Sequence, residues 1–275
     1  NYWCNGHAPA LTSPDTDTEM DDGLPRVSEG AHLKLDVDWV NLSACKTAAA
    51  EGKKRPVMLY FVILVIRLDV YPKFGLAIVG EVNPKNLLKN SEFRENDLVI
   101  LTKKLGIGVI TTAIKKQEST QEATEAAITS MLRLNDQAAK IAIESGATGA
   151  TDITGFGLLG HLGRAAQESK VNIEIDVSEV PLLPDARKLA LAGNLPGGSQ
   201  RNLEWIEDRV DASSVEDIDV HLLADAQTSG GLVFGVQPEK VETALKKLIE
   251  TGHDAAVIGR MHSGSGLIRL SNRQK

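Results

Sequence analysis

The chain has 275 residues, of which 42% are hydrophobic and 24% are charged, proportions that are typical of a globular protein and exclude disorder throughout the chain. Its formal net charge of −7 excludes the overall positive field with which proteins hold nucleic acid or an anionic membrane surface. Two cysteines, Cys4 and Cys45, cannot build a disulfide framework, so we expect a reducing, cytoplasmic environment.

The first third of the chain carries the weaker structural signals. Residues 1–30 are rich in Pro, Gly, Ser, Thr and acidic residues without a sustained apolar period, which predicts an irregular arm. The chain starts with Asn1 and shows no signal-peptide pattern, so we interpret this start as trimmed or artificial. Residues 31–84 predict a small β-rich domain, in which the apolar run from Val57 to Ile66 is too short for a membrane span and favours a buried strand.

Helix and strand patterns alternate from residue 85 to the C-terminus. A long helix is predicted from Ser119 to Ser145, because Ser119 stands three residues before Glu122, the spacing of a capping box, and Gly146 offers a C-cap. Shorter helices are predicted over 105–116, 185–193 and 239–252. Strands of one sheet are predicted over 97–103, 171–177, 230–236 and 255–261, with a further strand over 266–270. The alternation predicts a layered α/β (α+β) domain over residues 85–275.

A first glycine-rich stretch runs from Ala150 to His161 and spells ATDITGFGLLGH. If a strand ends at Asp152 and turns into a helix, Asp152 and Thr154 lie beside the free N–H groups of a helix N-terminus, where anions and their metal ions bind. An equally good interpretation is that Asp152 or Thr154 only caps this helix. His161 lies on an apolar helix face, where a core histidine is commoner than a ligand.

Two further polar stretches join the predicted elements. In 196–202 (PGGSQRN), Arg201 could clamp a phosphate or a carboxylate, whereas the alternative is a turn whose Asn202 caps the next helix. The stretch 225–231 (DAQTSGG) leads straight into a strand and either lines a site or packs against one. Neither has the sequence of a P-loop or of a dinucleotide-binding fingerprint, so an ordinary P-loop does not hold any nucleotide here.

Taken together, the three stretches resemble selenophosphate synthetase (selenide, water dikinase), of the AIR-synthetase-like (PurM-like) superfamily. The resemblance runs from about Phe74 to Leu270 in the family's order and spacing, and its most specific segments are TDITGFGLLGH and QTSGG. It implies a PurM-like C-terminal domain over 85–275 and makes 31–84 a truncated or divergent remnant of an N-terminal, β-rich, ATP-binding-type domain.

The resemblance also implies an activity. ATP, selenide and water would give selenophosphate, AMP and phosphate, with Mg²⁺ as cofactor, in a cytoplasmic homodimer that binds neither nucleic acid nor membranes. A dimer would also cover the apolar Val57 to Ile66 strand. Asp152 matches the family's metal-binding aspartate, and Asp225 is a weaker metal candidate next to Ala226, where the family usually has Pro. The nucleotide- and phosphate-binding candidates are Thr151, Thr154, Gly155, Arg201, Asn202, Thr228 and Ser229.

The N-terminal third departs from the family pattern. Ser43 to Lys46 (SACK) is similar to the family's reactive segment and makes Cys45 and Lys46 catalytic candidates, although it stands too close to the C-terminal domain. Asp36 and Asp38 imitate a metal-binding edge, but alternate acids on an exposed strand are commoner.

Three hypotheses follow from this departure. In the first, the chain is a divergent or truncated synthetase. In the second, it is a non-catalytic scaffold or regulatory relative, or another ATP-dependent enzyme of the superfamily. In the third, it is a family member whose first 66 residues are scrambled by a frame error. With one aspartate in place, we expect the chain as written to bind Mg²⁺-nucleotide weakly and to turn over slowly or not at all.

Overall fold

A computed structural model describes residues 57–58, 63–67, 72–76, 81–82 and 86–272. They fall into two compact units, of which the first holds strands β1 to β4 and the second holds residues 86–272. The predicted arm over 1–30 lies outside the described residues, as do Asp36, Asp38, Ser43, Cys45 and Lys46. No helix among the described residues is long and apolar enough to cross a membrane.

The first unit contains two antiparallel strand pairs. Strand β1 (Val57–Met58) pairs with β4 (Glu81–Val82), and β2 (Ile63–Arg67) pairs with β3 (Pro72–Leu76). Val57 faces Val82, and Ile63 faces Leu76, so both pairs follow the same antiparallel register. The described residues of the apolar run 57–66 therefore belong to two strands, β1 and β2. Both strands pair with residues of the segment 72–82, and the residue numbers of paired residues have the same sum in both pairs.

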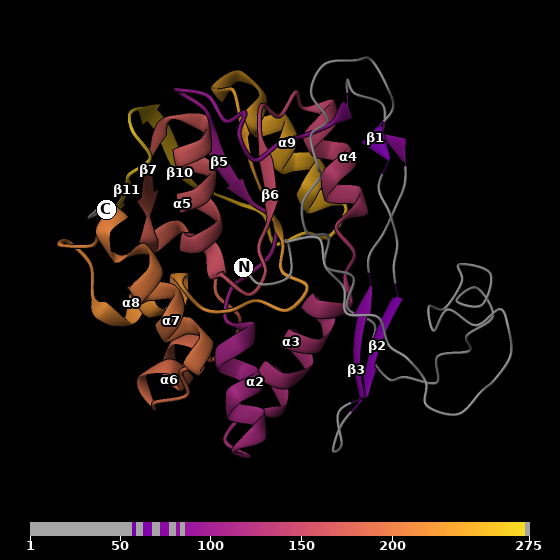
Figure 1. Cartoon of the computed structure of the whole chain (residues 1–275), viewed down its shortest axis with the longest axis vertical. Helices are drawn as coiled ribbons and strands as arrows, with labels where there is room; N and C mark the ends of the chain where they lie inside the picture. The colour runs from indigo at the N-terminus through magenta and orange to yellow at the C-terminus, as the bar shows by residue number, and fades with distance from the viewer. Residues whose placement is uncertain (1–56, 59–62, 68–71, 77–80, 83–85, 273–275) are drawn as a thin grey trace, which may run out of the picture. The chain divides into compact units, whose positions relative to one another are not determined.

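The second unit is built on a seven-stranded mixed sheet (Figure 1) with the order β6-β9-β5-β10-β7-β11-β8. Strand β11 runs parallel to β7 and β8, and the other neighbours are antiparallel. All four strands that the sequence predicts for one sheet belong to it, which confirms the mixed α/β class. The strands are β5 (Leu98–Leu101), β6 (Ala150–Asp152), β7 (Val171–Asp176), β8 (Val210–Asp211), β9 (Leu232–Val236), β10 (Ala256–Ser263) and β11 (Ile268–Ser271).

The second unit also contains eight α-helices in residues 86–272. They are α2 (Ile107–Lys115), α3 (Gln121–Leu132), α4 (Asp136–Glu144), α5 (Gly157–Ser169), α6 (Ala186–Leu191), α7 (Gly197–Ile206), α8 (Asp217–Leu223) and α9 (Pro238–Glu250). Two short 3₁₀ turns, η2 (Val177–Glu179) and η3 (Glu207–Arg209), complete the unit.

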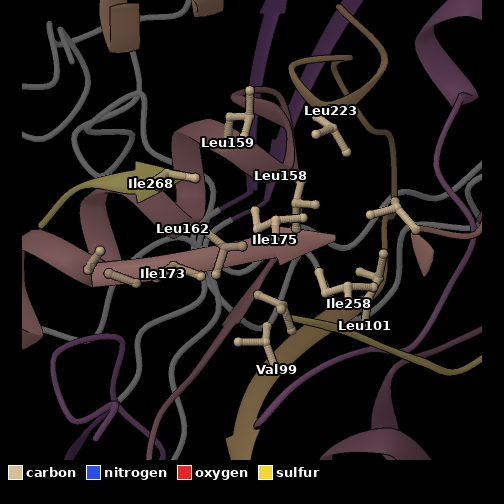
Figure 2. Close-up of a cluster of buried hydrophobic side chains, with 14 of the residues drawn as sticks. Val99, Leu101, Leu158, Leu159, Leu162, Ile173, Ile175, Leu223, Ile258 and Ile268 are labelled. Atoms are coloured by element: carbon tan, nitrogen blue, oxygen red, sulfur yellow. The ribbon is translucent and has the colours of Figure 1, made fainter. Parts of the chain in front are cut away.

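The pleat of β5 divides the core between the two faces of the sheet. Val99 and Leu101 belong to the cluster under α5, together with Leu158 and Leu162 (Figure 2). Ile100 points to the opposite face and packs in a second cluster with residues of α4 and α9. A third cluster joins α2, α3 and α6 away from the sheet. The apolar run of β5 is thus buried on both sides, as its sequence predicts.

The single helix predicted over 119–145 is wrong, because the chain forms α3 and α4 with a break between them. Arg133 is extended at the break (φ −69°, ψ 124°). Two tertiary hydrogen-bond partners hold the break: the Lys103 ammonium donates to the Arg133 carbonyl, and the Asn135 amide donates to the Gly230 carbonyl. The helical spacing of apolar residues continues through this break. The sequence pattern alone therefore does not show the break, because it depends on tertiary hydrogen bonds.

The predicted start of this helical region is also displaced by one residue. Thr120, and not Ser119, is the N-cap of α3, and its hydroxyl accepts the Ala123 N–H at 3.2 Å. The predicted end is confirmed, since α4 stops at Glu144 and Gly146 has a φ of +72°, the left-handed conformation that glycine adopts without strain.

Candidate functional site

The three polar stretches meet at one end of the sheet. They follow β6, precede β9 and include the start of α7. The Thr154 carbonyl accepts the Gln227 N–H at 3.0 Å, and the Asn202 amide donates to the carbonyls of Gly155 at 2.8 Å and Ala224 at 3.1 Å. Segments that lie up to 73 residues apart in the chain, as Thr154 and Gln227 do, are therefore joined directly by hydrogen bonds, and we take this cluster as the candidate site.

Asp225 is the buried centre of the cluster, with a relative exposure of 1%. One carboxylate oxygen accepts the N–H groups of Gly108 at 2.9 Å and Val109 at 3.3 Å, and the other accepts the Ser199 hydroxyl at 3.2 Å. Burial raises the pKa of Asp225 to about 6 against the lowering effect of these hydrogen bonds. The residue thus closes the N-terminus of α2, and its possible role as a metal ligand stays a prediction.

Gly108 permits this contact, since a Cβ there would collide with the Asp225 carboxylate and would lie 2.6 Å from the Ala226 carbonyl oxygen. The first turn of α2 can approach the 225–231 loop this closely only because Gly108 lacks a side chain.

Asp152 has the opposite environment. It is the last residue of β6 and is half-buried, and its desolvation raises its pKa. Apart from its own backbone, no residue within 86–272 forms a hydrogen bond or an ion pair with this carboxylate. A partly buried carboxylate without a counter-charge fits a cation.

The donor set limits what kind of cation this site can take. In the described part of the chain, no three His, Cys, Asp or Glu residues lie close enough to hold a metal ion. Mg²⁺ keeps several waters and is usually held by one or two carboxylates and by substrate phosphates. Asp152 therefore fits Mg²⁺ as one protein ligand, with the other ligands supplied by a phosphorylated substrate or by other residues.

His161 holds the loop that follows Asp152. Its Nε2 accepts the Thr154 backbone N–H at 3.1 Å and lies 3.0 Å from the Thr154 hydroxyl. Because a backbone N–H can only donate, Nε2 carries no proton and His161 is neutral. Burial, assisted by Arg164, lowers the pKa of His161 to about 4. His161 is therefore a half-buried residue that positions Thr154.

Neither Asp152 nor Thr154 caps the helix after this loop. The N-cap of α5 is Phe156, without a side-chain cap hydrogen bond, so the predicted capping alternative is wrong. Gly157 begins the helix with a φ of +68°, and a Cβ there would lie 2.5 Å from the Ala224 carbonyl oxygen. The turn is thus made by a glycine in the left-handed region and leaves the Asp152 side chain out of the cap.

The stretch 196–202 is not the turn that its glycine pair predicts. Pro196 is the N-cap of α7, so Arg201 and Asn202 lie inside a helix and Asn202 does not cap the next one. Asn202 is 7% exposed, and both of its amide hydrogens are used on the Gly155 and Ala224 carbonyls. Arg201 is exposed. The helix places Arg201 at the surface and uses Asn202 to hold two loops.

The remaining predicted site residues lie around the same cluster. Thr151 is half-buried in β6, and its hydroxyl donates to the Asp152 carbonyl at 3.3 Å. Thr228 is exposed, and Ser229 has a φ of +50° in the 225–231 loop. Cys45 and Lys46 lie outside the described residues, so the structure does not place them relative to this site.

Lys103 also contacts the candidate site, although sequence reasoning treated it only as the end of a strand. It is 2% exposed, and its ammonium donates to the carbonyls of Ser130 at 3.2 Å, Arg133 at 2.7 Å and Ser229 at 2.8 Å. Burial, assisted by the charge of Arg133, lowers the pKa of Lys103 to about 8. The signal available in the sequence was a lysine directly after a buried apolar strand. Lysine is rarely buried there unless other groups compensate its charge.

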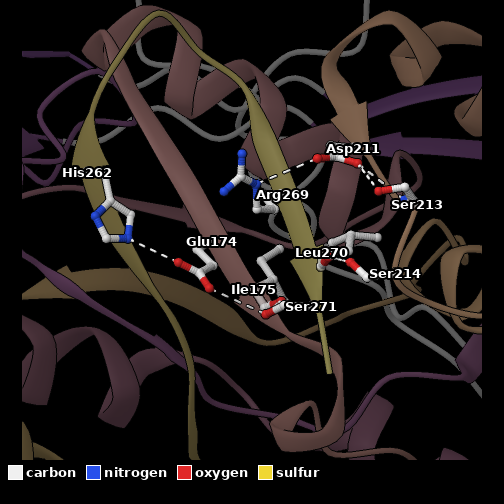
Figure 3. Close-up of polar contacts among 9 residues, drawn as sticks. All are labelled: Glu174, Ile175, Asp211, Ser213, Ser214, His262, Arg269, Leu270 and Ser271. Carbon is white, nitrogen blue, oxygen red and sulfur yellow. Dashed lines mark hydrogen bonds and ion pairs between the residues drawn. The ribbon is translucent and has the colours of Figure 1, made fainter. Parts of the chain in front are cut away.

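A groove of about 490 Å³ is lined mainly by β7, β8, β10 and β11. These strands lie toward the edge of the sheet that is opposite to β6 and β9. The polar lining of the groove includes a contact of 3.4 Å between the His262 Nε2 and the Glu174 carboxylate, and an ion pair between Arg269 and Asp211 at 3.6 Å (Figure 3). No residue of the three polar stretches lines this groove, so it is separate from the candidate site.

Comparisons with known proteins show the family of this chain. Residues 94–269 match the family model described as AIR synthase related protein, C-terminal domain. A selenide, water dikinase of Caldanaerobacter subterraneus subsp. tengcongensis is 43% identical over 194 residues, which cover 70% of this chain and 56% of that protein. One from Carboxydothermus hydrogenoformans is 40% identical over 201 residues, which cover 73% and 58%. The chain thus spans somewhat more than half the length of these relatives.

Solved structures support the fold alone. A thiamine-monophosphate kinase from Stenotrophomonas maltophilia superposes on 71% of this chain and 56% of its own, with a TM-score of 0.50 and 15% sequence identity. At this identity the likeness shows a shared PurM-like architecture, as predicted, and does not bear on substrate.

Proposed function

The chain belongs to the AIR synthase-related family, and from this premise we propose that it acts as a selenophosphate synthetase-like protein on ATP and selenide. The reaction would convert ATP, selenide and water to selenophosphate, AMP and phosphate. The resemblance predicted from the motifs is confirmed by the match to curated selenide, water dikinases. The whole reaction is a proposal, because the similarity covers little more than half of those proteins.

One observation carries the proposal: the half-buried Asp152 carboxylate has no partner from another residue within 86–272. Its pKa is raised by burial, so its charge is costly to maintain without a cation. Mg²⁺ bound here would neutralise phosphate oxygens during phosphoryl transfer. Asp152 would hold the ion, and the loop after it would keep the carboxylate in place.

The neighbouring residues divide into ligands and positioning residues. We propose that Thr151, Thr154 and Gly155 line the phosphate side of the Asp152 loop and that the exposed Arg201 and Thr228 approach the phosphates with Ser229. Asn202 would act indirectly, because its amide hydrogens already hold Gly155 and Ala224. Cys45 and Lys46 stay as proposed reactive residues, and a cytoplasmic homodimer stays the proposed assembly.

The test is the formation of AMP from ATP with Mg²⁺, with and without selenide, in the wild-type chain and in Asp152→Ala. We expect slow, selenide-dependent formation of AMP that Asp152→Ala abolishes. The matched control is Asp211→Ala, since Asp211 is an exposed carboxylate of the distant groove and its loss should leave the rate unchanged. Equal rates in the wild type and Asp152→Ala would contradict the proposed role of Asp152.

A second candidate function is a non-catalytic relative that keeps the scaffold and binds nucleotide. It is favoured by the use of the two candidate-site aspartates, since Asp225 is already bonded by α2 and Ser199 and Asp152 alone is left for a cation. Retained binding of Mg²⁺-ADP without any turnover would support this function over the first.

A further inference from the structure

Lys103 presents an energetic question that the proposed reaction does not answer. The residue is 2% exposed, and burial of an ammonium costs several kcal/mol unless other groups compensate. Within residues 86–272, Lys103 forms no ion pair with a carboxylate. All three of its hydrogen bonds go to backbone carbonyls. The charge is therefore kept in the interior without a counter-charge.

The three carbonyls belong to two separate parts of the fold. Ser130 and Arg133 lie at the end of α3, and Ser229 lies in the 225–231 loop. Lys103 itself follows β5 and is thus anchored in the centre of the sheet. Its ammonium fixes the Ser229 carbonyl at 2.8 Å, next to the glycine pair of the loop.

The loop beside this ammonium has unused hydrogen-bond donors. Gly230 and Gly231 are buried, and no acceptor in the described part of the chain is bonded to the N–H groups of residues 228–231. Buried backbone N–H groups rarely lack a partner. Consecutive free N–H groups with a positive charge beside them suit an anion.

We propose that Lys103 is a positioning residue for phosphate binding, which holds the 225–231 loop through Ser229 and supplies positive charge beside its free N–H groups. The inference rests on the proposed function for the class of ligand, a polyphosphate. Lys103 would not touch the phosphate itself, because its three donors are already used by protein carbonyls.

The chain offers two matched comparisons. Lys104 is the neighbouring cation, but it is 36% exposed and pairs with Asp254, so Lys104→Met removes an equal charge at the surface. Asn135 bonds the Gly230 carbonyl at 2.9 Å, so Asn135→Ala removes a neutral tether from the same loop. Asn135→Ala also disturbs the junction between α3 and α4, which makes it a control for purely structural damage.

The experiment measures pyrophosphate binding by calorimetry to the full chain, at a temperature where circular dichroism shows each variant folded. We expect Lys103→Met to weaken binding by about tenfold or more, the range of a lost charge-assisted contribution. Lys104→Met should leave binding unchanged, and Asn135→Ala should weaken it less than Lys103→Met does. Lys103→Gln, which keeps donors but loses the charge, is the second variant if Lys103→Met does not fold.

Three results would overturn the inference. They are unchanged pyrophosphate affinity in the folded Lys103 variants, an equal loss in Asn135→Ala and Lys103→Met that follows their melting temperatures, and no pyrophosphate binding by the wild type. None of them decides the proposed function, which is tested separately by selenide-dependent formation of AMP.

Discussion

Asp152 and Asp225 differ in how the protein compensates a buried carboxylate. Asp225 accepts hydrogen bonds from the start of α2 and from Ser199, whereas Asp152 receives none from another residue within 86–272. Both have a pKa raised by burial. The first carboxylate is thus used to join elements, and the second is left for a ligand.

The hydrogen bonds of Asp225 predict a graded loss of stability. Asp225→Ala leaves the N–H groups of Gly108 and Val109 buried without an acceptor, and we expect it to lower the free energy of unfolding by about 2–3 kcal/mol. Asp225→Asn should cost less, because its oxygen can accept from α2 while its amide donates to the Ser199 hydroxyl. Urea denaturation measures both, and an equal or larger loss in Asp225→Asn would contradict this account.

The raised pKa of Asp225 also predicts a pH dependence. Its pKa is about 6 in the folded chain and about 3.9 in the unfolded chain, so the folded state binds more protons between these values. The contribution of Asp225 to stability is therefore fully present below about pH 4 and is lost as pH rises through about 6. Denaturation of the wild type and Asp225→Asn from pH 4 to 7 should show their difference changing in this window and constant above it.

At the scale of elements, the start of α3 shows how a tertiary contact selects between two neighbouring N-cap candidates. The spacing of Ser119 and Glu122 fits a capping box, yet the adjacent Thr120 is the N-cap, and its hydroxyl also donates to Asp185 at 2.8 Å. Two adjacent hydroxyl residues give equivalent sequence signals. The tertiary contact with Asp185 is available only to Thr120, and a single sequence does not contain it.

This difference predicts unequal effects of two neighbouring substitutions. Thr120→Ala removes the cap and the bond to Asp185, and we expect it to lower the free energy of unfolding by about 1 kcal/mol. Ser119→Ala removes a hydroxyl that bonds only Thr124 and the Thr120 carbonyl nearby, so its effect should stay within about 0.5 kcal/mol. Thermal unfolding of both variants is the measurement. A larger loss of stability in Ser119→Ala than in Thr120→Ala would contradict this account and support the capping box of Ser119 and Glu122.

The same elements show how far sequence reasoning reaches. The strands β5, β7, β9 and β10 were predictable, because apolar β-branched runs between turn residues have few other solutions. The convergence of the polar stretches followed only from the family resemblance. The break between α3 and α4 and the helical position of Arg201 and Asn202 depend on tertiary bonds, such as those of Lys103 and Asn202. Local pattern does not contain such partners.

At the scale of the whole molecule, the core and the candidate site belong to the same unit. All three clusters of buried apolar side chains described above lie within residues 86–272, on both faces of the sheet and between the helices beside it. Asp152, Asp225 and Lys103 lie there too. The proposed reactive residues Cys45 and Lys46 lie in the other part of the chain, so turnover should need both parts, whereas stability should depend mainly on residues 86–272.

We therefore predict that a fragment of residues 86–275 folds but does not catalyse. It keeps the three core clusters, and a unit with its own core generally folds alone, so its thermal unfolding should be cooperative. It should not form AMP from ATP and selenide, because the proposed reactive residues Cys45 and Lys46 are removed. Calorimetry and the AMP assay are run beside the full chain. Turnover by the fragment equal to that of the full chain would show that residues 86–275 contain every catalytic group, and would exclude Cys45 and Lys46 from the reaction.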